Sequence, residues 1–255
     1  MNPTLHKILV PTIAIIIFLV LWEALVRVMG WPNYKMASPS DLIPAYERYW
    51  SLFLVMGWQT LWRTVLGLLL AIVVGTAIGM IMGFSRTMRD ALYPLLVGFN
   101  AIPKATVVPI VALMFVGAHD FNTVLIAFMI SFFPIAVSVS IGLSTLEPEY
   151  RDILRSLGAS QTTIFWKIAL PKTLPEFFGA LKVSVTLAFI GTNLMEIVSP
   201  HGRGLGALFD SGKTNSDYPL MFAVLIALAV LGIVLYYVVV ALERTFAGWA
   251  ERAPR

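Results

Sequence analysis

The chain is organised around one stretch, Glu147–Pro175, which reads EPEYRDILRSLGASQTTIFWKIALPKTLP. It is the longest interval without an apolar run of membrane length, and its own apolar residues recur at helical spacing beside two arginines. Gly158 supplies a helix stop that tolerates positive φ. Ser160 can cap a second short helix, which Pro171 and Pro175 should prevent from continuing smoothly. The pattern predicts a helix–Gly–helix at a membrane surface, with an apolar and basic face suited to contact with another protein.

The composition indicates a membrane protein. Of the 255 residues, 58% are hydrophobic and 13% are charged, whereas soluble domains carry about 25% charged residues. The absence of cysteine excludes disulfides and thiolate chemistry. Six apolar stretches reach the roughly 20 residues that a helix needs to cross a bilayer, at about 8–29, 60–83, 93–117, 121–143, 177–198 and 218–241. We therefore expect an all-α membrane protein with six transmembrane helices in a single domain, residues 1–255.

The distribution of Lys and Arg predicts the orientation of these spans. With the N-terminus inside, the inner segments hold ten of the 18 basic residues and the outer segments hold six. This bias places both termini and the stretch 147–175 in the cytoplasm. The first span could instead be a signal peptide, but no A-x-A site follows it, and its apolar run continues to Met29. Glu23 and Arg27 can pair near its outer end, since they are four residues apart.

Three further segments have interpretable patterns. Residues 38–53, SPSDLIPAYERYWSLF, predict a short amphipathic helix on the outer surface, capped by Ser40 or Asp41. Residues 199–219 form a Gly-rich polar loop with room for one short helix. In span two, small residues recur every four positions and let a neighbouring helix approach closely; they are Gly67, Ala71, Gly75, Gly79 and Gly83. This seam could be a moving interface or static packing, and we favour static packing.

No motif indicates an active site. Gly206–Thr214 is similar to a phosphate-binding loop, but five residues separate its glycines where that loop has four, and no strand precedes it. The chain lacks H-E-x-x-H and G-x-S-x-G, and its three histidines have no metal-ligand spacing. We therefore predict neither a catalytic nor a metal site. A membrane-embedded enzyme ranks far behind a transporter.

Polar residues in span five are candidates for a solute path, because ionisable groups at bilayer depth usually face a bundle interior or an aqueous cavity. Lys182, Thr186, Asn193 and Glu196 lie close to one helical face. Three of them have a structural alternative. Lys182 could snorkel to the inner interface, Glu196 could lie at the outer one, and Asn193 could bond between helices.

Span three should be broken at Pro103 and Pro109, around Lys104. Prolines free backbone carbonyls, which are tolerated at depth only where protein or cavity water satisfies them. Lys104 could attract an anion or cap the freed backbone, and we slightly favour the second. The residues that we expect to line or gate a translocation path are Asn100, Lys104, Lys182, Thr186, Asn193 and Glu196.

The central stretch resembles the EAA loop of binding-protein-dependent ABC transporter permeases, whose pattern is EAA–x3–G–x9–I–x–L–P. Asp152–Leu154 stand in the place of EAA, Gly158 follows after three residues, and Ile168 and Leu170-Pro171 complete the spacing. Asp152 replaces the usual glutamate, and Ile153-Leu154 replace the alanines. These changes bear on the affinity of the loop for its ATPase more than on its role in coupling. Three other segments are similar to the nitrate, sulfonate and taurine branch of these permeases, namely 38–43, 101–117 and 179–206.

The resemblance implies a type I ABC importer permease of the MetI-like fold, with a core at about 56–242 and the EAA loop, 147–175, as a cytoplasmic coupling helix. The implied partners are a second copy of the chain in a homodimer, two cytoplasmic ATPase subunits, an extracytoplasmic solute-binding protein and the lipid bilayer of the bacterial cytoplasmic (inner) membrane, with no nucleic acid. ATP and Mg would be bound by the ATPase, so no cofactor is expected in this chain. The implied ATPase-coupling residues are Arg151, Asp152, Ile153, Leu154, Arg155, Leu157, Gly158 and Ala159.

The same branch implies a small solute. It would be an organic or inorganic anion, such as nitrate, a sulfonate or taurine, or a small heterocyclic precursor. The two intramembrane lysines favour an anion. A stand-alone secondary transporter or channel is the alternative, but such proteins usually show internal hydropathy repeats, and none stands out here. A requirement for ATP and a separate ATPase distinguishes the two.

Overall fold

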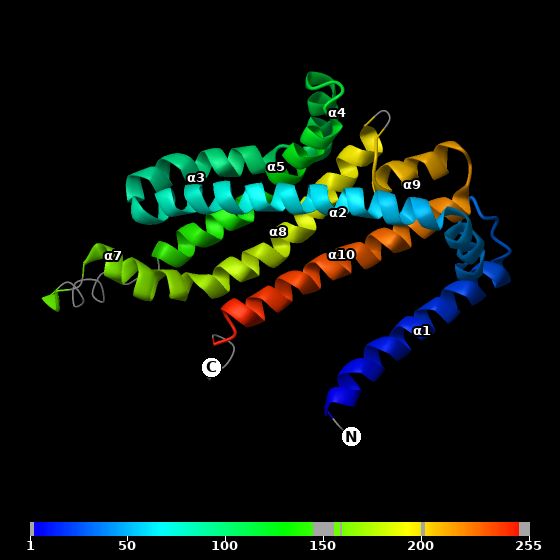
Figure 1. Cartoon of the computed structure of the whole chain (residues 1–255), viewed down its shortest axis with the longest axis horizontal. Helices are drawn as coiled ribbons and strands as arrows, with labels where there is room; N and C mark the ends of the chain where they lie inside the picture. Colours follow the sequence, from blue (N-terminus) through cyan, green and yellow to red (C-terminus); the bar gives the residue numbers. More distant parts are fainter. Residues whose placement is uncertain (1–2, 145–155, 159, 200–201, 250–255) are drawn as a thin grey trace.

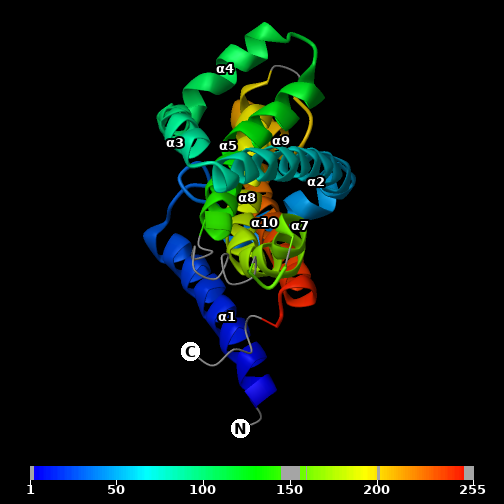
Figure 2. The ribbon, with the colours of Figure 1, turned by 90° about the vertical axis from the view of Figure 1, so that its left-hand side faces the viewer.

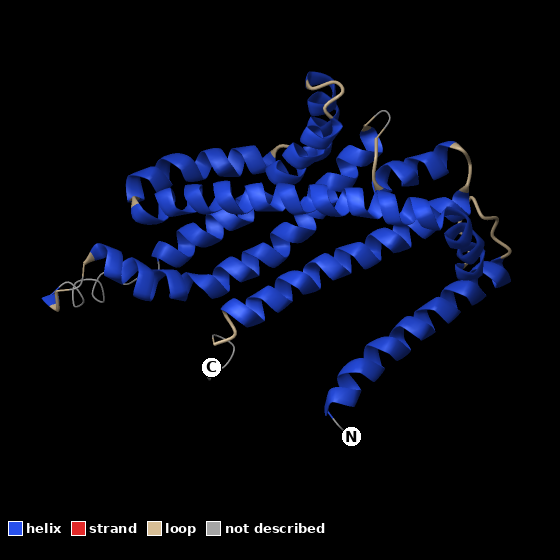
Figure 3. Cartoon of the chain, in the orientation of Figure 1, coloured by secondary structure: helices blue, strands red, loops and turns tan. Residues whose placement is uncertain are grey.

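The computed structural model describes residues 3–144, 156–158, 160–199 and 202–249. Within these residues every regular element is a helix and no strand occurs (Figure 3). The predicted all-α architecture is therefore confirmed. Five helices are long and apolar enough to cross a membrane: α1 (Pro3–Met29), α2 (Pro39–Phe84), α5 (His119–Ser144), α8 (Leu170–Val198) and α10 (Tyr218–Phe246).

The predicted break in span three is confirmed. Two helices, α3 (Arg86–Ala101) and α4 (Lys104–Met114), are bent by 86° relative to each other. Between them Ile102 is extended (φ −65°, ψ 126°), because a residue before proline is pushed out of the helical region. Pro109, the other predicted breaker, lies inside α4 without ending it. Figures 1 and 2 show α3 running beside α2 and α4 turning away; counted as one span, the pair supplies the sixth.

The short helix predicted at 38–53 is present as the first part of α2, where two helices meet at a kink with no loop between them. No proline lies between that segment and the span, and the one glycine there, Gly57, stays within the helix. Its course changes at Tyr49 (φ −111°, ψ 15°). Ser38, rather than Ser40 or Asp41, precedes the helix. The Ser38 N–H and hydroxyl donate to the Asp41 carboxylate at 3.1 and 2.7 Å.

The seam of small residues on α2 packs against α5 of the same chain. A Cβ added at Gly67 would lie 2.5 Å from the Ala127 Cβ. A Cβ added at Gly79 would lie 2.6 Å from the Ala136 carbonyl oxygen. Neither distance leaves room for a side chain, so the two backbones are in direct van der Waals contact, as small-residue seams allow. The seam thus belongs to the packing of the bundle.

The prediction that Pro171 and Pro175 prevent smooth continuation of the second helix is confirmed at Pro171, which a π-helical turn precedes, and is wrong at Pro175. α7 (Gln161–Ile164), a five-residue π-helix, η1 (Phe165–Ala169), and α8 follow one another without a gap. The π-helical turn changes the hydrogen-bonding register immediately before Pro171, which has no N–H to donate. Pro175 is then contained within α8.

The first helix, α1, is attached to the rest mainly at its C-terminal end. α1 diverges from the bundle in Figure 1, and most of its apolar side chains are exposed. Near its end, Trp22 and Val26 are buried. The predicted Glu23–Arg27 pair forms, and the Ser40 N–H and hydroxyl donate to Glu23 at 3.0 and 2.9 Å. The expected short helix in the last polar loop is α9 (Leu205–Thr214).

Candidate functional site

The stretch 147–175, which is predicted to couple to the ATPase and is called the coupling stretch below, is described only in part. Of its predicted contact residues, Leu157 and Gly158 lie within the described chain, whereas 151–155 and Ala159 lie outside it. The Leu157 side chain is 77% exposed. Gly158 has φ +81°, the left-handed conformation that glycine adopts at a helix end. The Ser160 hydroxyl accepts the Thr163 N–H at 3.1 Å, so the predicted stop and cap are both confirmed.

Arg89 fixes the helix end that leads into this stretch. Its Nε donates to the Met82 carbonyl at 3.2 Å, and its other guanidinium nitrogen donates to the Ser144 hydroxyl. Met82 belongs to α2, and Ser144 is the last residue of α5. One arginine on α3 therefore joins the ends of two other helices beside the coupling stretch. From the sequence, Arg89 was only one of the ten basic residues counted in the inner segments.

Two of the predicted path residues share a groove. Lys182 and Thr186 line a hollow of about 450 Å³ together with Tyr236 of α10. The Lys182 ammonium donates to both carboxylate oxygens of Glu243 at 2.9 Å. The Thr186 hydroxyl bonds back to the Lys182 carbonyl at 3.3 Å. The lysine thus reaches the groove with its charge already compensated.

The other predicted path residues lie apart from this groove. The Lys104 ammonium donates to the Phe99 carbonyl and lies 4.5 Å from the centre of the Phe99 ring. This is the backbone-capping arrangement that we slightly favoured. Asn100 is exposed on the last turn of α3. Asn193 donates to the Phe189 carbonyl of its own helix at 2.7 Å. Within one chain, then, the six residues do not form a single site.

Glu196 belongs to a buried ionic cluster. Its side chain is 1% exposed and that of Arg63, on α2, is 2% exposed; their charged atoms are 3.2 Å apart. The Thr60 hydroxyl and the Gly206 N–H also donate to the Glu196 carboxylate, at 2.8 and 3.0 Å. Arg63 further contacts Asp120 at 2.6 Å. The cluster thereby joins α2, the start of α5, the end of α8 and the start of α9.

Two glycines make room for this carboxylate. At Gly204 (φ +119°) an added Cβ would lie 2.0 Å from a Glu196 carboxylate oxygen, and at Gly206 it would lie 2.7 Å from the Glu196 Cβ. Arg63 also donates to the carbonyl of Arg203. Arg63 was counted among the six basic residues of the outer segments and was not predicted as a site residue. The available signal was a charge at the edge of the apolar run 60–83.

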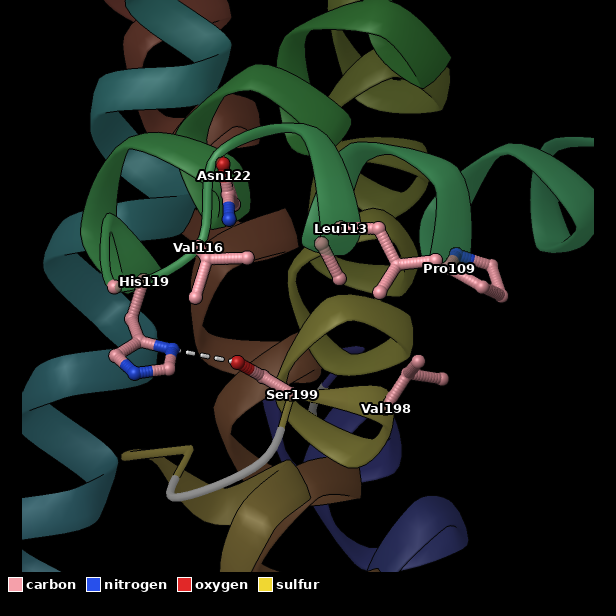
Figure 4. A pocket seen from close by; sticks show the side chains of 9 residues that line it. Pro109, Leu113, Val116, His119, Asn122, Val198 and Ser199 are labelled. Carbon is pink, nitrogen blue, oxygen red and sulfur yellow. Dashed lines mark hydrogen bonds between the residues drawn. The ribbon is translucent and has the colours of Figure 1, made fainter.

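A second cavity, of about 480 Å³, lies where α4, α5 and the end of α8 meet (Figure 4). The His119 Nδ1 and the Ser199 hydroxyl are hydrogen-bonded at 2.6 Å along one side. The Asn122 amide, which is buried, donates to the Phe115 carbonyl at 3.0 Å. Most of the remaining wall is aliphatic, formed by Pro109, Ala112, Leu113, Val116 and Val198. The cavity is therefore an apolar space with a few polar groups at its edge.

A more polar hollow of about 350 Å³ adjoins it. Gly117 and His119 line both spaces, and the hollow is completed by Asp120, Arg203 and neighbouring residues. Our sequence analysis found no role for His119, because its partner Ser199 lies 80 residues away.

Comparison with known proteins identifies the family. Residues 75–248 match the family model described as "Binding-protein-dependent transport system inner membrane component". The chain is 31% identical to the formylaminopyrimidine transport permease protein ThiX of Halalkalibacterium halodurans, over 97% of this chain and 98% of the relative. It is also 31% identical to the riboflavin transport system permease protein RibX of Chloroflexus aurantiacus, over 93% and 88%. The taurine transport system permease protein TauC of Escherichia coli is 25% identical, over 84% and 82%.

A solved structure shares the fold. A chain of the inward-facing MetNI methionine ABC transporter superposes with a TM-score of 0.63 at 19% identity, covering 78% of this chain and 98% of that one. The six-span bundle described above is thus the MetI-like type I importer fold that the sequence predicts. The chain belongs to the family of binding-protein-dependent transport system inner membrane components and is a permease component of an ABC importer.

Proposed function

We propose that this permease imports a small nitrogen heterocycle. An extracytoplasmic binding protein delivers the solute, and two cytoplasmic ATPase subunits power its passage through a homodimer of this chain. The observation that carries the solute class is the pair of relatives that are 31% identical, since both are named for transport of nitrogen heterocycles. The taurine relative is 25% identical and a nitrate relative is 26% identical.

The pairing of the two intramembrane lysines supports the same choice. From the sequence we favoured an anion, because Lys104 and Lys182 lie within predicted spans. In the structure Lys182 is neutralised by Glu243, and Lys104 is occupied by the Phe99 carbonyl and ring. A cation that is already paired attracts a second anion weakly. A small anion stays the second candidate, because the relatives that are 25–26% identical are named for taurine and nitrate.

Energy coupling through the EAA loop is part of the proposal. Exposed Leu157 beside left-handed Gly158 supports it, because the chain there presents an apolar side chain at a helix end. The proposed contact residues remain those predicted from the sequence: Arg151, Asp152, Ile153, Leu154, Arg155, Leu157, Gly158 and Ala159. ATP and Mg would be bound by the ATPase partner, and movement of its docking surface would shift the flanking spans between two packed arrangements.

The groove beside α8 is the part of the proposed path that the structure supports best. Lys182 and Thr186 both line it, and Asn193 and Glu196 continue along the same helix. Asn100 and Lys104 would act at the break between α3 and α4.

Reconstitution of the complete importer tests the proposal. The binding protein encoded beside this chain is first screened by thermal shift against formylaminopyrimidine, riboflavin, taurine and nitrate. The permease, ATPase and binding protein are then placed in proteoliposomes, and uptake of each solute is measured with and without ATP. ATP-dependent uptake of formylaminopyrimidine or riboflavin supports the proposal. Uptake of taurine or nitrate alone moves the assignment to the second candidate, and uptake that needs neither ATP nor ATPase indicates a secondary transporter.

A further inference from the structure

The cavity between α4, α5 and α8 has the size and lining of a site for a small ring, and it is open on the α4 side, where Leu113 and Val116 are 76% and 82% exposed. Its volume of about 480 Å³ lies within the range of about 300–1,000 Å³ found for small-molecule sites. Such sites are largely apolar with a few placed polar groups. Here the aliphatic side chains of Pro109, Leu113 and Val198 form apolar walls, and the polar groups gather at one edge (Figure 4).

The polar edge is built from fixed groups. His119 and Ser199 hold each other at 2.6 Å. The His119 carbonyl also accepts the Thr123 hydroxyl at 2.8 Å, which anchors the first turn of α5. Asn122 is held by the Phe115 carbonyl on the loop between α4 and α5. Hydroxyl, imidazole and amide groups can each exchange hydrogen bonds with the ring nitrogens and amino groups of a heterocycle.

The charge of the lining argues against an inorganic anion. Among the lining residues, which all lie in the described chain, none is Lys, Arg, Asp or Glu. A permanently charged solute would lose its hydration in this apolar space without a counter-ion, which is costly. A neutral or weakly polar ring would keep its few hydrogen bonds at the edge and place its faces on the aliphatic walls.

The adjoining polar hollow offers a route to the cavity. His119 and Gly117 line both spaces, and Asp120 and Arg203 line the hollow alone. The His119–Ser199 hydrogen bond joins the start of α5 to the end of α8 at the boundary. This end of the bundle is the one that the positive-inside count places outside, where a binding protein would release its solute.

We propose that this cavity is a binding site for the transported heterocycle inside the permease, with the His119–Ser199 pair at its entrance. This proposal depends on the proposed function only for the identity of the solute that occupies the site. A solute released into the polar hollow passes when α5 and α8 separate at this pair. Re-forming the hydrogen bond closes this entrance.

The absence of cysteine from the chain provides a direct test. Ala112→Cys places a thiol on the cavity wall, and Ile110→Cys, on the same helix but outside the lining, is the matched control. Ile110 is 53% exposed. Maleimide labelling is measured on the reconstituted importer with formylaminopyrimidine, riboflavin, taurine or nitrate added. We expect formylaminopyrimidine or riboflavin to slow labelling of Ala112→Cys at least threefold and to leave Ile110→Cys unchanged.

The labelling result separates the site from the function. Protection of Ala112→Cys by taurine or nitrate alone overturns the heterocycle as occupant. Protection by none of the four solutes overturns the site, even where the uptake assay supports the proposed function. Conversely, wild-type uptake of taurine or nitrate alone refutes the proposed function, whatever the labelling shows.

A second pair of variants tests the volume. Ala112→Phe fills the cavity, and we expect uptake at low solute concentration to fall at least tenfold, while Ile110→Phe stays within twofold of wild type. Equal uptake by the two variants contradicts the site. Ser199→Ala tests the entrance, and it should change the KM for uptake more than the maximal rate.

Discussion

Replacing Glu196 with leucine removes the acceptor at the centre of the buried cluster. The change leaves the Thr60 hydroxyl and the Gly206 N–H without their carboxylate and takes one of two acidic partners from Arg63. Breaking a buried ion pair by removing one partner costs about 3–5 kcal/mol. Arg63 keeps Asp120 at 2.6 Å, so we expect the lower end, about 3 kcal/mol.

Thermal unfolding of the purified permease measures this loss. The seven tryptophans provide an intrinsic fluorescence signal. For a chain of this size, 1 kcal/mol corresponds to about 2–4 °C in Tm, so Glu196→Leu should lower Tm by about 6–12 °C. Glu47→Leu, an exposed glutamate on α2, is the matched control and should leave Tm close to wild type. A Glu196→Leu midpoint within about 2 °C of that control would refute the reasoning.

The double variant Arg63→Met/Glu196→Leu tests whether the two residues act as a pair. Apolar replacements of similar volume often match or exceed a buried ion pair in stability. Asp120, which is 61% exposed, would then return to water. We expect the double variant to recover most of the lost Tm. Additive losses from the two single variants would contradict a coupled pair.

Three further changes test other parts of the molecule. Gly158→Val places a β-branched residue at φ +81°, and we expect normal assembly with loss of binding-protein-stimulated ATP hydrolysis; normal stimulation would remove Gly158 from the coupling contact. Lys182→Glu should abolish uptake, and the charge swap Lys182→Glu/Glu243→Lys should restore it if the pair only stabilises the bundle; failure of the swap in a folded protein indicates contact between Lys182 and the solute. Gly79→Leu should cost about 1–3 kcal/mol of stability through overpacking against α5, and a folded yield equal to wild type would contradict the close approach at that seam.

Features fixed by nearby residues could be predicted from the sequence. The break between α3 and α4 follows from the restriction that Pro103 places on Ile102, and the Glu23–Arg27 pair follows from helical spacing. The left-handed Gly158 is likewise a local consequence of a helix end. Each of these depends on a handful of consecutive positions.

Features that depend on contacts between distant residues could not be predicted. Arg63 and Glu196 are separated by 133 positions, and the residues around each one do not indicate that the other is its partner. The continuation of the chain through Pro171 depends on a π-helical turn, for which the sequence has no simple periodic signal. The cavity beside His119 exists only because three helices meet there.

The seam between α2 and α5 has a mechanical consequence. Because backbone contacts backbone at Gly67 and Gly79, α5 cannot slide or rotate against α2 without a steric clash, so the two move as one rigid body. α5 ends at Ser144, where the coupling stretch begins, and starts at His119, beside the cavity. Its 26 residues span about 39 Å. A displacement applied by the ATPase at the Ser144 end would therefore be transmitted along this rigid pair to the His119 end.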